Sequence, residues 1–407
     1  METGKIDLPG HRLDIDVVYL RDQLRALLEI ASPTGYTDTI VRHVCHELER
    51  LGVRYDLTRR GAIRARIPGA SQLGARAIVS HVDTLGAQVK ALKSNGRVAL
   101  VPIGTWSARF AEGARVTVFT QKGTYRGTIL PPKASGHTYG DEVDTAPIGW
   151  EHLELRVDAF AANARHLHRL GIEIGDFVAV DPQPEFLENG FIVSRHLDDK
   201  AGVAIMLASM KALLATDTVP PVDLFWLFTI AEEVGHGAAA VLVPDIASLV
   251  AIDNGTSAQG QNSAEYGVTI AMADQTGPFD YHLTRKLVEL CQENDIRYQK
   301  DVFRFYRSDS ASAIEAGEDV RTALITFGVS ASHGYERIHM HALRSLAELV
   351  TAYGLSGVEI PRDEHALAGL SGFTRQPSEH DAAALYPAVE LPPGFDDLER
   401  DEDDEEE

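Results

Sequence analysis

The sequence ARAIVSHVD, residues 75–83, joins an apolar run to two side chains that can take part in a metal site. A continuous apolar run of this length predicts a strand that is buried on both faces, as in a parallel sheet. The run ends at His81 and Asp83. Because open α/β sheets carry their chemistry at the carboxyl ends of strands, we expect both side chains to face a functional site.

Helix and strand patterns alternate along the chain on both sides of this run. Apolar residues spaced by three and four predict helices at 16–30 and 37–51, joined by the turn SPTGY, and further helices at 200–215, 279–294, 308–316 and 341–354. Apolar runs predict strands at 222–231, 248–253, 267–273 and 321–328. This alternation predicts an α/β fold, a doubly wound mixed sheet flanked by helices.

The pattern changes between residues 88 and 192. Short β-type runs such as GRVALVPIG and ARVTVFTQKG are separated there by Gly, Pro and Asn turns, which predicts a small all-β domain inserted into the chain. The catalytic α/β domain would then comprise residues 1–87 and 193–355. Residues 356–407 are loop-like and end in DDLERDEDDEEE, a run of like charges for which we expect a disordered acidic tail.

Composition and charge exclude several classes of protein. Hydrophobic residues make up 44% and charged residues 24% of the 407, as in ordinary globular proteins. A net charge of -22 argues against a nucleic-acid partner, because phosphate binding requires a basic surface. No apolar stretch is long enough to span a membrane and no signal peptide begins the chain, so we expect a cytoplasmic protein. We expect Cys45 and Cys291 to be buried, non-catalytic thiols.

Five motifs place metal-ligand side chains at or just beyond the ends of predicted strands. They are SHVD (His81, Asp83), RHLDDKAG (Asp198, Asp199), AEEVG (Glu232, Glu233), IDNG (Asp253) and SHGYE (His333, Glu336). Mixed imidazole and carboxylate ligands suit zinc, cobalt or manganese. A bridging carboxylate can hold two such ions about 3.5 to 4 Å apart.

Each motif alone also has an ordinary explanation. A lone His-x-Asp is more often a structural pair, Asp198 and Asp199 could cap the following helix, and IDNG could be a turn. The Glu232–Glu233 pair could simply be solvated after its strand. All five motifs nevertheless follow apolar runs of one α/β scaffold and offer complementary ligand types, which favours a shared site.

The chemistry of hydrolysis suggests a role for several of these side chains. A carboxylate beside a metal-bound His fixes its tautomer, a role that suits Asp83 next to His81. Adjacent glutamates at a strand end point in different directions, so one can bind metal while the other faces the metal-bound water. Something must take the proton from that water and pass it to the leaving amine, and we assign this catalytic role to Glu232.

The order SHVDTLG, an insertion, HLDDKAG, AEEVG, IDN and a late His resembles the glutamyl aminopeptidase family of dinuclear metallopeptidases, which includes the tetrahedral aminopeptidases. The resemblance covers residues 20–355. It implies two divalent metal ions, most simply zinc. In the family pattern, His81 and Asp253 would bind one metal, Glu233 and His333 would bind the other, and Asp198 would bridge the two. Glu232 would be the general base, and Asp83 would orient His81.

Two positions depart from the family pattern. Lys200 stands where many members have Arg, and SHGYERIHMH replaces the familiar His-Ser pattern, so that His333 competes with His339 and His341 as the last ligand. We favour His333 because it follows a predicted strand directly. SHGYE and YGVTIAMAD also resemble a bacterial subgroup associated with the osmoprotectant N-acetylglutaminylglutamine amide, which suggests a substrate.

The leading functional prediction is removal of N-terminal residues from short peptides through a metal-bridged water activated by Glu232. The alternative is an amidase or deacylase acting on a small N-acylated or amidated dipeptide. A third hypothesis is a non-catalytic metal-binding scaffold, although no predicted ligand or base is missing. The family resemblance also implies a homo-oligomer, built from dimers that can form dodecamers.

Overall fold

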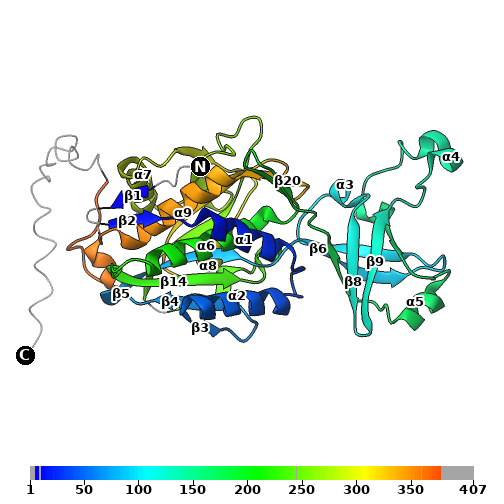
Figure 1. Ribbon diagram of the computed structural model, residues 1–407, viewed down its shortest axis with the longest axis horizontal. Helices are drawn as coiled ribbons and strands as arrows, with labels where there is room; N and C mark the ends of the chain where they lie inside the picture. The colour runs from blue at the N-terminus through cyan, green and yellow to red at the C-terminus, as the bar shows by residue number, and fades with distance from the viewer. Residues whose placement is uncertain (1–4, 9–10, 244, 359, 377–407) are drawn as a thin grey trace, which may run out of the picture.

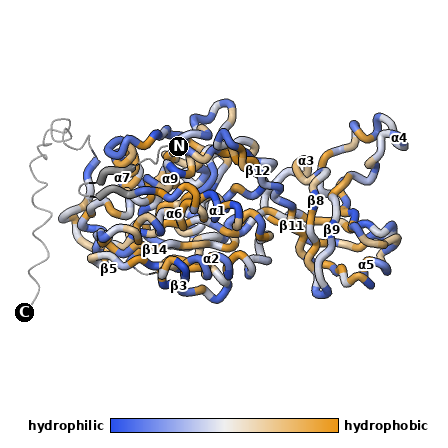
Figure 2. The backbone as a smooth tube through the Cα atoms, in the orientation of Figure 1, coloured by the Kyte–Doolittle hydropathy of each residue, from blue (hydrophilic) through white to orange (hydrophobic). Residues whose placement is uncertain are grey.

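The computed structural model describes residues 5–8, 11–243, 245–358 and 360–376, so the predicted acidic tail lies outside the described residues. It consists of an α/β part and a β-barrel at one end (Figure 1). Hydrophobic residues gather in the interior of the α/β part around α6 (Figure 2). Among the described residues, no helix is long and apolar enough to cross a membrane.

A nine-stranded mixed sheet forms the centre of the α/β part. Eight strands follow one another in the order β17 (Gly277–Pro278), β16 (Val268–Asp274), β19 (Arg321–Val329), β15 (Ile246–Thr256), β5 (Ser71–His81), β14 (Val222–Thr229), β4 (Ile63–Ile67) and β3 (Arg54–Leu57), and β18 (Tyr298–Val302) pairs with β16. The central four, β19-β15-β5-β14, are parallel. After β5, the chain adds β14 on one side of this strand and then β15 on the other, so the direction of strand addition reverses between β5 and β15. Open α/β sheets usually carry their functional sites at such a reversal. The predicted fold class is confirmed.

Six longer helices accompany this sheet, close to the predicted positions. They are α1 (Val17–Leu28), α2 (Asp38–Leu51), α6 (Leu197–Leu214), α7 (Tyr281–Glu293), α8 (Asp309–Glu315) and α9 (Met340–Leu355). Helix α6 packs against α1, α9, β5 and β15, and its residues are buried along almost its whole length. A helix that is apolar on all sides is expected in the interior of a protein. The burial of α6 fixes the position of Asp198, which lies at its start.

The barrel closes with the strand order β10-β7-β6-β11-β8-β9. Its strands are β6 (Gly86–Leu92), β7 (Val98–Ile103), β8 (Arg115–Thr120), β9 (Gly123–Leu130), β10 (Glu154–Val157) and β11 (Phe177–Val180). A separate cluster of buried apolar side chains fills it. The barrel segment also contains short helices that the β-rich pattern did not predict: α3 (Ala108–Ala111), α4 (Gly136–Tyr139) and α5 (Ala164–Leu170).

Smaller elements join or border the two parts. A three-stranded sheet pairs β12 (Glu185–Phe186) and β13 (Phe191–Ser194) with β20 (Glu336–His339), and β1 (Lys5–Leu8) pairs with β2 (His11–Asp14). Single 3-10 turns occur at Gly140–Glu142, Trp150–His152, Glu232–Val234, Ala238–Ala240 and Pro361–Glu364. Both cysteines are free and buried, as predicted. The boundaries at 88 and 192 remain a prediction.

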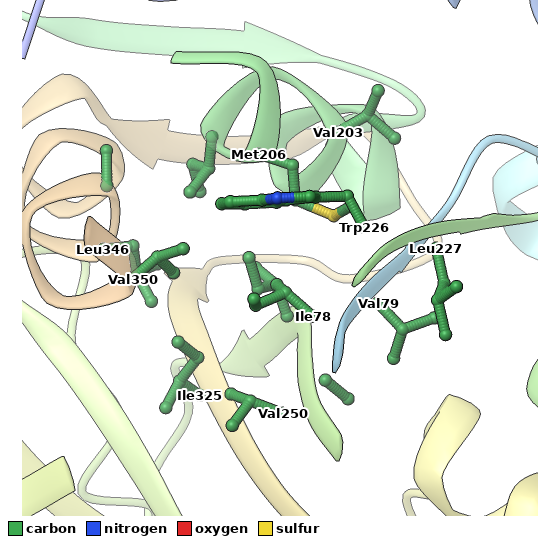
Figure 3. Packing of buried hydrophobic residues seen from close by; sticks show 14 of the residues in the cluster. Ile78, Val79, Val203, Met206, Trp226, Leu227, Val250, Ile325, Leu346 and Val350 are labelled. Carbon is green, nitrogen blue, oxygen red and sulfur yellow. The ribbon is translucent and has the colours of Figure 1, made fainter. Parts of the chain in front are cut away.

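We expect Trp226→Ala to lower the free energy of unfolding by about 3 to 5 kcal/mol, the usual cost of deleting a large buried aromatic side chain. Trp226 is fully buried in β14, beside Met206 and Val203 of α6 (Figure 3). Trp226→Phe should lower the free energy of unfolding by less than Trp226→Ala does, because the indole N–H has no acceptor among the described residues and its loss breaks no hydrogen bond. Urea unfolding followed by circular dichroism measures both. Leu57→Ala, at an exposed position, is the control, and equal midpoints for all variants would contradict the prediction.

Candidate metal centre

His81 is the last residue of β5, and its imidazole is almost fully buried. Its Nδ1 lies 3.0 Å from the Asp83 main-chain oxygen and 3.5 Å from the Asp83 carboxylate. Its Nε2 lies 3.2 Å from Asp198 Oδ1. An Nδ1–H that donates to Asp83 leaves the Nε2 lone pair directed at the centre of the site, which is the tautomer a metal requires.

Asp198 lies between the two histidines of the site. Its Oδ1 faces His81, while its Oδ2 lies 3.2 Å from His333 Nε2 and accepts a 2.5 Å hydrogen bond from the Asn254 side-chain amide. The carboxylate therefore presents one oxygen to each histidine. Asp198 and Asp199 have non-helical backbone angles at the start of α6, so they stand where a helix cap would be expected. The Asp198 carboxylate nevertheless contacts the two histidines and Asn254 instead of capping the helix.

The neighbouring Asp199 points away from the two histidines. Its carboxylate accepts hydrogen bonds from the Ser80 hydroxyl and the His81 main-chain N–H. Gly202 allows this approach, since a Cβ there would lie 2.4 Å from the Asp199 carboxylate and 2.7 Å from Ser80 Oγ. The glycine of the DDKAG motif thus lets α6 pack closely against the end of β5.

Two clusters of potential ligands share Asp198. The first contains His81, Asp198 and Asp253, and the second contains Asp198, Glu233 and His333; within each, the ligand atoms lie within 4.8 Å of one another. Asp253 comes from β15, next to β5 at the reversal of strand order. The structure therefore brings together all five residues predicted to bind metal, in the two groups predicted. Their coordination of metal remains a prediction.

Glu232 and Glu233 form the 3-10 turn that follows β14, and Asp83 holds this turn in place. The Glu232 and Glu233 main-chain N–H groups lie 3.2 and 3.4 Å from the two Asp83 oxygens, and the Thr34 hydroxyl donates to Asp83 at 2.6 Å. Glu233 Oε2 lies 3.8 Å from His333 Nε2, whereas Glu232 Oε2 lies 3.9 Å from His81 Nε2. The two glutamates thus face different halves of the site.

His333 is the one of the three candidate histidines that lies beside Asp198 and Glu233. Its Nδ1 is 2.8 Å from the Thr105 main-chain oxygen, in the segment after barrel strand β7, so that Nε2 is left to face Asp198. His339 instead approaches the Asn189 main-chain oxygen and accepts a hydrogen bond from the His341 main-chain N–H at the start of α9. The geometry therefore supports the choice of His333.

Glu336 fixes the main chain at two of the predicted ligands, His333 and Asp198. Its carboxylate accepts hydrogen bonds from the main-chain N–H groups of His333, at 2.9 Å, and Asp198, at 3.2 Å. Lys200 plays no direct part, since its ammonium donates to the Ile30 main-chain oxygen and burial lowers its pKa to about 7. Lys200 therefore contacts the segment that follows α1 (Val17–Leu28) and forms no hydrogen bond or ion pair with a ligand side chain among the described residues.

The electrostatics of the site fit bound cations. Burial, reinforced by the charge of Asp198, raises the pKa of Asp253 to about 8 and that of Glu233 well above its usual range. Glu233 Oε1 and Asn254 Oδ1 are buried without a hydrogen-bond partner among the described residues. Several buried carboxylates with unused lone pairs are costly unless a positive charge compensates them, and two divalent ions would do so.

Sequence reasoning did not assign roles to several residues that border the site. Asn254 contacts Asp198, and Thr105 orients His333 from the barrel. Asp309 of α8 accepts from the Thr229 hydroxyl at 2.8 Å, and its other carboxylate oxygen lacks a partner among the described residues. The buried Tyr306 hydroxyl interacts with the Asp253 carboxylate. The adjacent IDN motif could have revealed Asn254. The other three lie in segments without a ligand motif.

Comparison with known proteins identifies the family. The model of the M42 glutamyl aminopeptidase family matches residues 61–349. The putative aminopeptidase YhfE of Bacillus subtilis is 36% identical over 331 residues, covering 81% of this chain and 95% of that protein. The chain belongs to the M42 glutamyl aminopeptidase family. M42 peptidases are dinuclear metal enzymes, so the predicted family and the predicted class, a metal-dependent hydrolase of aminopeptidase type, are confirmed.

A more distant relative and two solved structures are also similar to this chain. The glutamyl aminopeptidase of Lactococcus lactis is 26% identical over 54% of this chain and 62% of that protein. The fold matches that of an aminopeptidase from the archaeon Desulfurococcus kamchatkensis, with a TM-score of 0.76, 22% identity, and coverage of 87% of this chain and 99% of that one. It also matches the TET1 peptidase of Pyrococcus horikoshii, with a TM-score of 0.73, 21% identity, and coverage of 83% and 99%.

For this M42 protein, Asp83→Asn should weaken metal binding about 10- to 100-fold, as loss of a carboxylate that orients a metal-bound His usually does. The asparagine keeps the side-chain volume but removes the charge that faces His81 Nδ1. Titration of chelator-stripped protein with Zn²⁺ against a competing chelator measures the change. Asp56→Asn, on the exposed face of β3, is the matched control, and unchanged affinity in Asp83→Asn would contradict the role.

Metal affinity should also rise with pH. The pKa values of Asp253 and Glu336 are both raised to about 8 by burial and the nearby charge of Asp198, so these carboxyl groups retain protons below that pH. A cation must displace such protons, and its affinity should therefore fall as the pH drops from 8 toward 6. Calorimetry with Mn²⁺ in buffers of different ionisation enthalpy would detect the released protons. A pH-independent affinity without proton release would contradict this prediction.

Proposed function

We propose that this protein removes N-terminal residues from short peptides, with Glu232 as the general base. The observation that carries the proposal is the position of Glu232. It lies 3.9 Å from His81 yet belongs to neither ligand cluster, while Asp198 is shared by both. A general base must lie close to the attacking water and must not itself coordinate the metal, and the position of Glu232 meets both conditions.

The electrostatic surroundings of Glu232 suit proton transfer. Burial, with the charges of Asp253 and Asp309, raises its pKa well above the usual range. A carboxylate with a raised pKa can accept a proton from water and then release it to the leaving amine near neutral pH. Two divalent ions, when bound, would polarise the scissile carbonyl and make the attacking water more acidic.

We assign the ligands as His81, Asp198 and Asp253 for one ion and Asp198, Glu233 and His333 for the other. Asp83 and Glu336 would be positioning residues, since they hold ligands through hydrogen bonds. The mixture of imidazole and carboxylate donors supports zinc, with cobalt or manganese as alternatives.

Assembly and location are further parts of the proposal. One structural neighbour is described as a dodecamer, and the Pyrococcus horikoshii peptidase as forming a tetrahedron or an octahedral shell. We propose a homo-oligomer built from dimers, located in the cytoplasm, with residues 88–192 as the inserted domain. Light scattering tests the assembly, and a monomer would refute it without affecting the chemistry.

A panel of matched dipeptides with free and N-acetylated amino termini tests the activity itself. We expect the protein loaded with Zn²⁺, Co²⁺ or Mn²⁺ to hydrolyse the free set and to lose activity after chelation. Turnover of the blocked set alone would establish the amidase or deacylase alternative. Loss of activity on chelation, followed by recovery on adding metal, would exclude contamination by a metal-independent peptidase.

A further inference from the structure

A half-buried arginine borders the candidate metal centre and forms no ion pair among the described residues. Arg195 lies between β13 and α6, three residues before Asp198, and its side chain lines a pocket together with Asp198 and His333. The opposite lining is apolar and comes from Leu85, Trp106 and Val180. The pocket thus joins the metal centre to the barrel, whose strand β11 ends at Val180.

The Arg195 guanidinium makes no ion pair and no hydrogen bond with the described residues. Its Cζ atom lies 5.9 Å from the centroid of the Tyr335 ring, and the charge of Glu336 acts on it without forming an ion pair. Two other partly buried arginines differ in this respect: Arg64 donates to three main-chain oxygens, and Arg321 pairs with Asp280 and Asp363. Burial lowers the pKa of Arg195, and the charge of Glu336 offsets this effect only in part.

An unpaired guanidinium in such a pocket has a strong preference for one type of ligand. It carries five N–H donors in a planar fork, and a carboxylate accepts two of them side by side. The Arg195 donors have no hydrogen-bond acceptor among the described residues, and an anion that enters the pocket can accept from two of them at once. The nearby Glu336 does not serve, because its carboxylate already accepts from the main chain of Asp198 and His333.

We infer that Arg195 is a specificity-determining residue that binds a carboxylate of the substrate, held beside the scissile bond. This inference rests on the proposed peptidase function. The carboxylate could come from the side chain of an N-terminal acidic residue or from the C-terminus of a dipeptide. Both present the same planar anion within one residue of the bond that is cleaved, and the experiment separates them.

Two matched substrate pairs test the inference with the full-length, metal-loaded protein. Glutamyl and glutaminyl p-nitroanilide differ only in a side-chain carboxylate, and Ala-Ala and Ala-Ala amide differ only in a C-terminal carboxylate. In one pair the wild type should favour the carboxylate member. Arg195→Gln should reduce kcat/KM for that member about 10- to 100-fold, mainly through KM, and change its neutral partner less than about threefold, the effect expected for one charge-assisted pair.

Two further variants separate recognition from a general structural effect. Arg195→Lys should restore part of the preference, because it keeps the charge but loses the planar fork. Arg337→Gln is the control, since Arg337 of β20 pairs with Glu265 and does not line the pocket. An equal loss for both members of each pair in Arg195→Gln would overturn the inference, as would a wild type without preference in either pair.

Calorimetric binding of the same four compounds keeps this inference distinct from the proposed function. A metal-loaded wild type that hydrolyses none of them would refute the aminopeptidase proposal. The role of Arg195 would then be judged from binding alone. Tighter binding of a carboxylate member that Arg195→Gln abolishes would support it, and equal binding of both members of each pair would overturn it.

Discussion

A Glu232→Gln protein should lose peptidase activity by about a thousandfold or more while it keeps both metal ions. Glutamine has nearly the same shape as glutamate but cannot accept the proton from water, and loss of a general base usually costs about 10²- to 10⁴-fold. Glu232 belongs to neither ligand cluster, so the metal content should remain that of the wild type. Steady-state kinetics and elemental analysis measure the two effects on the same preparation.

Glu233→Gln is the matched control, because it makes the same chemical change one residue away. Glu233 lies in the cluster with Asp198 and His333, so this variant should lose one ion as well as activity. The pair of variants therefore distinguishes a base from a ligand. Full activity in Glu232→Gln would show that the base is a different residue, and metal loss in Glu232→Gln would mean that Glu232 is itself a ligand.

Asp198→Ala should remove both metal ions and with them all measurable turnover. Asp198 belongs to both ligand clusters and directs one carboxylate oxygen at each histidine, so its loss affects both ions at once. Elemental analysis after dialysis measures the metal content. Circular dichroism should show an intact fold, since the strands and helices do not depend on this side chain.

His333→Ala provides the comparison for Asp198→Ala. His333 belongs to one cluster only, so this variant should keep the ion bound by His81 and Asp253. The expected order of metal content is wild type, then His333→Ala, then Asp198→Ala. Equal metal content in the two variants would contradict the bridging role of Asp198 and would require the two clusters to be assigned again.

The longer helices and the five strands β5, β14, β15, β16 and β19 of the α/β part were predicted from the sequence, whereas β3, β4, β17 and β18 were not. The strand predicted at 321–328 is β19 (Arg321–Val329), and the helix predicted at 37–51 is α2 (Asp38–Leu51). Helices of the barrel segment, such as α5 (Ala164–Leu170), were missed because they lie among short β-type runs that predict strands. Barrel strands β6 and β10 were also not predicted individually.

The candidate site was predictable as a set of residues but not as a network. His81, Asp198 and Glu233 follow apolar runs in recognisable motifs. The support that Thr105 gives to His333 comes from a barrel loop 228 positions away in the chain, and no local pattern signals such a contact. Arg195 was likewise part of a quoted motif, yet its lack of a partner appears only when its neighbours in space are known.

Hydrophobic periodicity depends on residues that are neighbours in the chain, so the sequence by itself determined the α/β class, the insertion and the order of the ligand motifs. The family resemblance had already implied that Asp198 is the shared carboxylate, but only the tertiary structure decided the physical basis of that choice. That choice depends on the register of β5 and β15 and on the packing of α6 against them, which place Asp198 between His81 and His333. The tertiary structure also explains how Glu232 and Glu233, already assigned different roles, come to face different halves of the site, because hydrogen bonds to Asp83 fix the turn that carries both.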